Sequence, residues 1–269
     1  MKYKNTMNLD LTGKNAIVCG STQGIGKAVA VELAQMGANI ILIARNADKL
    51  KAVKSELDTS KGQEHHFLPV DFAIPAQLKL VLENYFEINK SDIHILVNNT
   101  GGPAGGPIED AKIDEFIHAF SNHLLCNHIL VKAVKEGMKK SGYGRIINII
   151  STSVKQPLNG LGVSNTIRGA VANWSKTMAN ELGQFGITVN NVLPGATDTI
   201  RLQSIMETNA TKKGKSVNEI KQEMANEVPL KRIAQPEEIA NAVAFLASPA
   251  ASYINGINLP VDGGRTKSL

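Results

Sequence analysis

The sequence has few cysteines, no long hydrophobic run and no concentrated region of one charge. Its two cysteines, Cys19 and Cys126, fall in a predicted buried strand and a predicted helix, which disfavours a disulfide framework and fits a reducing compartment. No apolar run approaches the length that crosses a membrane. The segment from Met1 to Leu11 is too polar for the hydrophobic part of a signal peptide. We therefore expect a cytoplasmic protein that does not contact a membrane.

Basic and acidic residues nearly balance, and no linker divides the chain. The net charge is +5, from 29 basic and 24 acidic residues. The one basic cluster, Lys212, Lys213 and Lys215, is more typical of a solvated loop than of a nucleic-acid patch. We expect no nucleic-acid partner and assign no metal site. Because 43% of the residues are hydrophobic and no internal repeat is present, residues 1–269 are predicted to form a single domain.

The most informative segment is a glycine-rich turn between a predicted strand at 16–19 and an amphipathic stretch that begins at Ala28. A strand, a glycine turn and a helix in this order present backbone N–H groups to an anion. Gly24 would let the backbone approach a pyrophosphate, and Gly26 would let the helix pack closely on the strand. For the glycines alone, an ordinary structural turn remains the alternative. The candidate phosphate-binding residues are Gly20, Ser21, Thr22, Gln23, Gly24, Ile25 and Gly26.

Short apolar strands alternate with helices along the rest of the chain. This alternation predicts a single α/β domain, a Rossmann-type doubly wound parallel sheet with helices on both faces and ligands at the carboxyl ends of its strands. The predicted strands cover 39–44, 66–70, 93–97, 145–150, 187–193 and 257–261, and the predicted helices cover about 47–60, 75–88, 112–140, 161–183 and a segment from 236.

The end of the second predicted strand carries Arg45 where dinucleotide folds place an acidic residue that binds the ribose 2′-hydroxyl. A guanidinium binds the 2′-phosphate that a carboxylate would repel. Arg45 therefore favours NADP(H) over NAD(H), and the alternative is a solvent-facing arginine paired with an acid. Asp71 is a candidate for the adenine amino group, although a helix cap would explain it equally well.

Further motifs follow the glycine turn along the chain. They are Asn98-Asn99-Thr100-Gly101, Gly144-Arg145-Ile146-Ile147-Asn148-Ile149, Asn190-Asn191-Val192-Leu193-Pro194-Gly195 and Pro236-Glu237-Glu238-Ile239-Ala240. With these motifs the chain from Leu11 onward resembles the short-chain dehydrogenase/reductase family, in particular its 3-oxoacyl-(acyl-carrier-protein) reductases. The resemblance implies a small-molecule or acyl-thioester substrate and additional cofactor contacts. The implied contacts are Asp71, Phe72, Asn98, Thr100, Gly101, Arg168, Pro194, Gly195 and Thr199.

The family's catalytic set is an asparagine, a serine, a tyrosine and a lysine, and this chain matches only the serine, at Ser151. Ser164 occupies the tyrosine position and Arg168 the lysine position, while the asparagine position falls on His123, or on Asn122 with a one-residue slip. A serine hydroxyl is a much weaker acid than a phenol, and an arginine does not release a proton as a lysine can. The resemblance implies that the N–H donors of the Arg168 guanidinium can still bind the hydroxyls of the nicotinamide ribose.

His123 is the candidate proton donor that the sequence offers in place of the tyrosine. Histidine titrates near about 6.5, and the resemblance places this one behind Ser151. We expect it to supply the proton directly or through water. A helix histidine bonded to backbone is the alternative.

Two functions remain open. The first is an NADP(H)-dependent oxidoreductase on a carbonyl or alcohol substrate, and the second is a catalytically degenerate NADP(H)-binding sensor or inactive oligomer partner. The segment 200–228 lies where the family carries its substrate lid, and we expect it to be partly helical. The helices around 112–140 and 161–183 are apolar on more than one face, and the resemblance implies a homotetramer or a homodimer through them.

Overall fold

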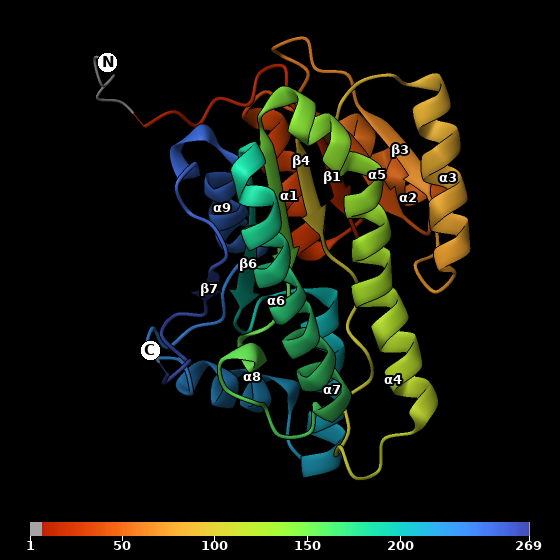
Figure 1. The fold of residues 1–269 in the computed structure, drawn as a ribbon. Helices are drawn as coiled ribbons and strands as arrows, with labels where there is room; N and C mark the ends of the chain where they lie inside the picture. The colour runs from red at the N-terminus through yellow and green to blue at the C-terminus, as the bar shows by residue number, and fades with distance from the viewer. Residues whose placement is uncertain (1–6, 269) are drawn as a thin grey trace.

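A seven-stranded parallel sheet forms the centre of the molecule (Figure 1), in the computed structural model that describes residues 7–268. The strand order is β3-β2-β1-β4-β5-β6-β7, so the direction of winding reverses between β1 and β4. This is the doubly wound α/β fold that the alternation predicts. The strands are β1 (Asn15–Cys19), β2 (Asn39–Ala44), β3 (His66–Pro69), β4 (Ile95–Asn98), β5 (Gly144–Ile149), β6 (Ile187–Pro194) and β7 (Asn258–Val261).

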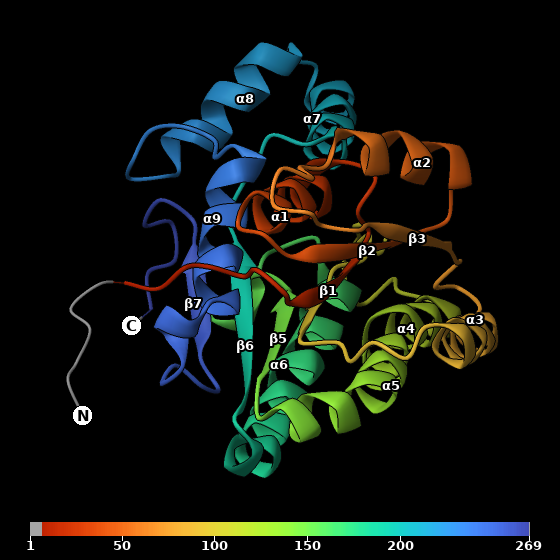
Figure 2. The ribbon, with the colours of Figure 1, turned by 90° about the horizontal axis from the view of Figure 1, so that it is seen from above.

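Helices cover both faces of the sheet (Figure 2). One face packs against α1, α2 and α9, and the other packs against α3, α5 and α6. Within residues 7–268 no helix is long and apolar enough to cross a bilayer. The helices are α1 (Gly24–Gln35), α2 (Ala47–Glu56), α3 (Pro75–Ile88), α4 (Ile113–Phe120), α5 (Cys126–Ser141), α6 (Gly162–Leu182), α7 (Ile200–Lys213), α8 (Val217–Asn226) and α9 (Pro236–Ala247).

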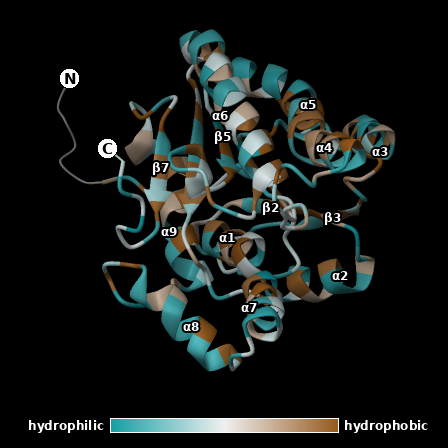
Figure 3. Cartoon of the chain, turned by 90° about the horizontal axis from the view of Figure 1, so that it is seen from below, coloured by the Kyte–Doolittle hydropathy of each residue, from teal (hydrophilic) through white to brown (hydrophobic). Residues whose placement is uncertain are grey.

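The strands are apolar on both sides, which is why the sheet needs two helical layers. In β1, Ala16 and Val18 join the cluster under α1 and α9, whereas Ile17 and Cys19 join the cluster under α3 and α5. All four side chains are fully buried. Figure 3 shows the same division, with apolar segments inside and hydrophilic segments on the outer sides of the helices. Cys19 and Cys126 are both buried free thiols.

The predicted long helix over 112–140 is present, and the chain is helical without a break over 113–141. The sequence did not predict the π-helix inside it, Ser121–Leu125, which joins α4 to α5 and holds one extra residue in its turn. The predicted lid over 200–228 is two helices, α7 and α8, around a small apolar cluster of their own. Its helix α7 is capped by the Thr199 side chain, which accepts from the backbone N–H of Leu202.

A ladder of asparagine side chains crosses the sheet at one level. The strand register aligns Asn98, Asn148, Asn191 and Asn258 on four neighbouring strands. Asn98 donates to Asn148 at 2.8 Å, Asn148 donates to Asn191 at 3.0 Å, and Asn191 donates to Asn258 at 2.8 Å. Ser175 of α6 joins the ladder, accepting from Asn148 and donating to Asn191. A buried polar chain of this kind fixes the relative height of the strands, because a slip would leave amides unpaired.

Replacing the central amide should therefore be costly. We expect Asn148→Leu to lower the free energy of unfolding by about 3 kcal/mol or more, because three buried partners lose a hydrogen bond at roughly 1–3 kcal/mol each. Denaturant unfolding measures the change. The control is Asn173→Leu on the exposed side of α6, which we expect to stay within about 0.5 kcal/mol. Equal losses in both variants would show that the ladder is not a stabilising element.

Candidate functional site

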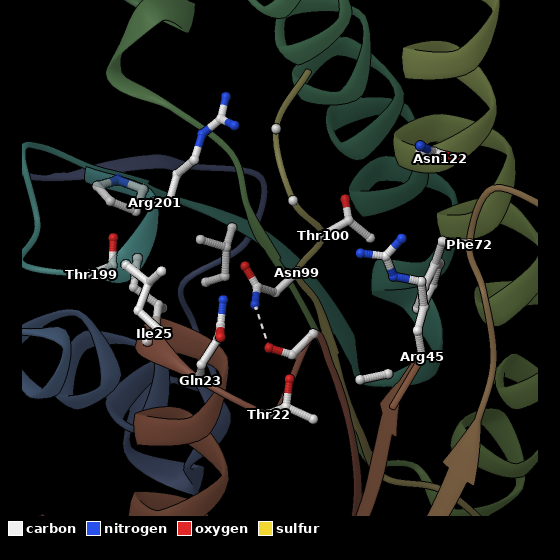
Figure 4. A pocket seen from close by; sticks show the side chains of 18 of the residues that line it. Thr22, Gln23, Ile25, Arg45, Phe72, Asn99, Thr100, Asn122, Thr199 and Arg201 are labelled. Carbon is white, nitrogen blue, oxygen red and sulfur yellow. Dashed lines mark hydrogen bonds between the residues drawn. The ribbon is translucent and has the colours of Figure 1, made fainter. Parts of the chain in front are cut away.

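A cleft of about 1150 Å³ opens at the carboxyl ends of the strands, beside the reversal between β1 and β4. Parallel sheets wound in two directions leave a crevice at this point because the loops after the two neighbouring strands diverge. The turn after β1, the end of β2, the loop after β4 and the end of β6 all contribute to the wall (Figure 4). The start of α7 closes one side with Ile200 and Arg201.

The glycine turn is held by close backbone packing. Gly20 and Gly24 adopt φ values of +60° and +54°, which side chains rarely adopt. A Cβ on Gly26 would lie 2.2 Å from the Gly20 carbonyl oxygen, so only glycine fits there. The Asn99 amide from the loop after β4 donates to the Cys19 and Gly20 carbonyls at 3.2 and 3.4 Å (Figure 4). The turn is thereby tied to β4.

The N-terminus of α1 faces the cleft without a side-chain cap. Its N-cap residue, Gln23, makes no capping hydrogen bond, and the first turn holds no acidic residue. The first backbone N–H groups of a helix need an acceptor, and the positive end of the helix dipole favours an anion. Gln23 and Gly24 both line the cleft. The residues present therefore fit the pyrophosphate of a dinucleotide.

Arg45 lies at the end of β2 with its side chain 77% exposed. Its Nη1 is 4.0 Å from Asp71 Oδ2, a loose surface contact that leaves the guanidinium available. Asn46 caps α2, and Lys49 adds a second positive charge to the same part of the wall. Arg45 and Lys49 outweigh the single negative charge of Asp71, so this end of the cleft is positively charged and fits a ribose 2′-phosphate.

Arg168 enters the cleft from α6 and is 92% buried, with a relative exposure of 8%. Its Nη1 donates to the Ile149 carbonyl at 3.1 Å, which fixes the side chain at the end of β5. Burial, and then the nearby positive charge of Arg201, lower the pKa of Arg168 from 12.5 to about 10. The guanidinium therefore carries its charge at neutral pH although the side chain is buried.

His123, the candidate proton donor, lies behind the wall of the cleft rather than on it. The side chain is 2% exposed, does not line the cleft, and lies 2.5 Å from the Thr100 hydroxyl through Nδ1. Burial, and then the charge of Arg168, lower the pKa of His123 from 6.5 to about 2. It is a neutral imidazole at physiological pH. The π-helix turns Asn122 into the cleft instead, and the Asn122 Oδ1 is buried without a partner in the described residues.

The two candidate serines lie beside the cleft wall. Ser151 is half-buried two residues after the end of β5, and its hydroxyl accepts from the backbone N–H of Ser153 at 3.1 Å. Ser164 is half-buried in the first turn of α6, four residues before Arg168 and so on the same helix face. Neither is among the residues that line the cleft, although Ile150 and Arg168 beside them are.

Most of the predicted cofactor residues line the cleft, and three do not. Ser21 is buried and donates to the Ile43 carbonyl, Gly26 lies under the turn, and Asn98 belongs to the asparagine ladder. These three residues hold the site in place from behind. The lining residues among the predictions are Gly20, Thr22, Gln23, Gly24, Ile25, Arg45, Asp71, Phe72, Thr100, Gly101, Arg168, Pro194, Gly195 and Thr199.

Sequence reasoning missed three polar residues of the wall, Asn46, Lys49 and Arg201, and it gave Asn99 only as part of a motif and Asn122 only as the alternative to His123. Lys49 stands four residues after Arg45 and Arg201 two residues after Thr199, so proximity in sequence was an available signal for both. For the asparagine position the sequence left Asn122 and His123 open, because the π-helix decides which of the two neighbours faces the cleft.

Known proteins match almost the whole chain. The family model described as enoyl-(acyl carrier protein) reductase matches residues 20–266. The NADPH-dependent reductase BacG of Bacillus subtilis is 29% identical and covers 96% of this chain and 100% of its own length. The 3-oxoacyl-[acyl-carrier-protein] reductase FabG of Vibrio cholerae is 36% identical, over 95% of this chain and 98% of its own. The structure of L-sorbose reductase from Gluconobacter frateurii, complexed with NADPH and L-sorbose, superposes with a TM-score of 0.91 at 32% identity, over 98% of this chain and 100% of its own.

The buried neutral His123 makes the protein sensitive to acid. Its folded pKa lies below its unfolded value near 6.5, so below that pH the unfolded chain takes up a proton that the folded chain does not, and stability falls. Lowering the pH from 7 to 5 should reduce the free energy of unfolding by about 2 kcal/mol through this group, because each pH unit below the unfolded pKa costs about 1.4 kcal/mol. We expect His123→Asn to lose that dependence in urea unfolding at the two pH values. The exposed His118→Asn is the control, and parallel pH profiles for wild type and His123→Asn would contradict the assignment.

Proposed function

The chain belongs to the short-chain dehydrogenase/reductase family, and from that premise we propose that it transfers a hydride between NADP(H) and a carbonyl or alcohol substrate in the cleft. The observation that carries the proposal is the uncapped N-terminus of α1 facing the cleft, with Arg45 and Lys49 at the end of the cleft where the 2′-phosphate would lie. Related reductases named as NADPH-dependent support the choice of cofactor.

The cofactor supplies the hydride when it is bound. The α1 N–H groups and the backbone of the glycine turn hold its pyrophosphate, while Arg45 and Lys49 hold its 2′-phosphate. Arg168 takes the place of the family's lysine and donates to the hydroxyls of the nicotinamide ribose, a role that needs donors but no change of protonation. Its burial keeps the guanidinium in one position for this task.

Carbonyl reduction also requires a proton at the substrate oxygen. Ser151 and Ser164, beside the wall, would donate hydrogen bonds that orient this oxygen, and a water in the cleft would supply the proton, because His123 is neutral and lies behind Thr100. Losing the phenol removes a contribution of about 10²–10⁴-fold from the rate, and orientation of the hydride donor remains.

The helices α7 and α8 serve as the substrate lid, since Ile200 and Arg201 already form part of the wall. The relatives that reduce 3-oxoacyl carrier-protein substrates make a 3-oxoacyl thioester one candidate substrate. We also propose a cytoplasmic homotetramer or homodimer. Exposed Ile113, Ile117 and Phe120 on α4, at 73%, 55% and 40% exposure, support an apolar subunit contact there.

The choice of cofactor should depend on Arg45. We expect Arg45→Gln to weaken NADPH binding about tenfold or more and to leave NADH binding within about twofold, because a charge-assisted bond to the 2′-phosphate contributes about 1.5–3 kcal/mol. Titration by cofactor fluorescence measures both affinities. The control is Lys51→Gln, which removes an equal charge from the exposed side of α2. Equal weakening of NADH would place Arg45 outside the 2′-phosphate site.

The proposed activity is tested with the purified protein, NADPH and a panel of ketones, aldehydes and 3-oxoacyl thioesters. We expect NADPH oxidation, and in Ser151→Ala a fall in kcat/KM of about tenfold or more at unchanged NADPH affinity, since one substrate hydrogen bond is lost. Ser55→Ala on the exposed side of α2 is the control. Tight NADPH binding without turnover of any compound would leave the sensor or inactive partner as the function.

A further inference from the structure

Two guanidinium groups meet in the cleft far from the Arg45 end. Arg168 comes from α6, and Arg201 comes from the first turn of α7 (Figure 4 labels Arg201 and Arg45). Arg201 follows β6, and Arg45 ends β2. Three strands separate these two in the sheet, so the two basic regions belong to opposite ends of the cleft.

The two side chains converge on one point. An atom at the Cβ position of Gly102 would lie 3.9 Å from the Nη2 of Arg168 and 3.9 Å from the Nη2 of Arg201. The two nitrogens are therefore no farther apart than twice that distance. An oxyanion that accepts from each nitrogen at about 2.8 Å can span such a gap.

Like charges at this separation repel, and nothing in the described chain offsets them. Asp71 is the only carboxylate among the residues that line the cleft, and it lies beside Arg45. Within residues 7–268 neither Arg168 nor Arg201 forms an ion pair. Each donates to one backbone carbonyl, Arg168 to Ile149 and Arg201 to Pro103 at 2.6 Å. The fork of a guanidinium has five N–H donors, so most donors of both remain free.

The anionic groups of the cofactor are already matched elsewhere. Its pyrophosphate fits the uncapped start of α1, and its 2′-phosphate fits Arg45 and Lys49. NADP(H) carries no further phosphate. The positive charge at Arg168 and Arg201 is thus left for the substrate.

We propose that Arg168 and Arg201 form a subsite for an oxyanion carried by the substrate itself, so that the preferred substrates are oxo acids or oxo phosphates rather than neutral ketones or aldehydes. This proposal rests on the proposed function. The donors of Arg168 then serve both the nicotinamide ribose and the substrate, and Arg201 adds a contact that closes the α7 side of the cleft over the anion. The Arg201 guanidinium donates to the Pro103 carbonyl, and this hydrogen bond ties the loop after β4 to the start of α7.

The test compares pairs of related compounds of which one member carries the anionic group and the other is neutral. A 2-oxo acid is compared with its methyl ester, and dihydroxyacetone phosphate with dihydroxyacetone, by calorimetric titration into NADP⁺-loaded protein and by KM with NADPH. We expect the charged member of one pair to bind at least tenfold more tightly. The pair that shows this preference identifies the anion as a carboxylate or a phosphate.

The decisive variant is Arg201→Gln, with Lys212→Gln at the exposed far end of the same helix as its charge-matched control. We expect Arg201→Gln to reduce the preference for the charged member about tenfold and to leave NADPH affinity within about twofold. We expect Lys212→Gln to keep the preference of the wild type. Increasing salt should weaken binding of the charged member alone.

Three results would overturn the subsite. The charged and neutral members could bind equally, Arg201→Gln could keep the full preference, or Arg201→Gln could weaken NADPH as much as the acid, which would assign Arg201 to the cofactor. A protein that binds no NADPH would refute the proposed function separately. The same titration on the unloaded protein then decides the subsite, which stands if the acid binds in an Arg201-dependent way and falls if it does not.

Discussion

The close approach of Gly20 and Gly26 is the constraint on which the site depends. No side chain fits between the two residues, so the backbone turns from β1 into α1 within a few residues and leaves the start of the helix uncapped. The Asn99 amide holds this turn against β4, across the point where the winding of the sheet reverses. Removing the contact would separate the N-terminus of α1 from the crevice in which its unsatisfied N–H groups find an acceptor.

The wall of the cleft carries its charge in three separate places. Arg45 and Lys49 lie at the end of β2, the helix dipole acts at α1, and Arg168 and Arg201 lie on the side of α6 and α7. The first two places are those expected of an NADP(H) site. The third is a departure, because a lysine at position 168 would present a single compact charge, whereas the buried arginine offers a planar fork that can bind a second group.

Side chains from α6 and from the π-helix lie at this part of the wall. Ser164 retains a hydroxyl on the helix face that carries Arg168, and the π-helix brings Asn122 to the cleft. His123 is packed behind it against Thr100, in a buried environment where a charged imidazole is strongly disfavoured. Under the proposed function these side chains orient the substrate and donate hydrogen bonds to it, and none of them acts as a titrating acid.

The sequence alone determined the sheet, its parallel strands and the glycine turn, because these depend on local patterns of apolar residues and on the conformations that glycine permits. It also identified Arg45, whose place follows directly from the end of a strand. Only the tertiary structure decided that Asn98 belongs to a ladder of amides, that His123 is neutral and buried, and that Arg201 meets Arg168. Burial, a pKa and the meeting of two charges arise from segments far apart in the chain, and a π-helix shifts which neighbour faces the cleft. No local pattern contains that information.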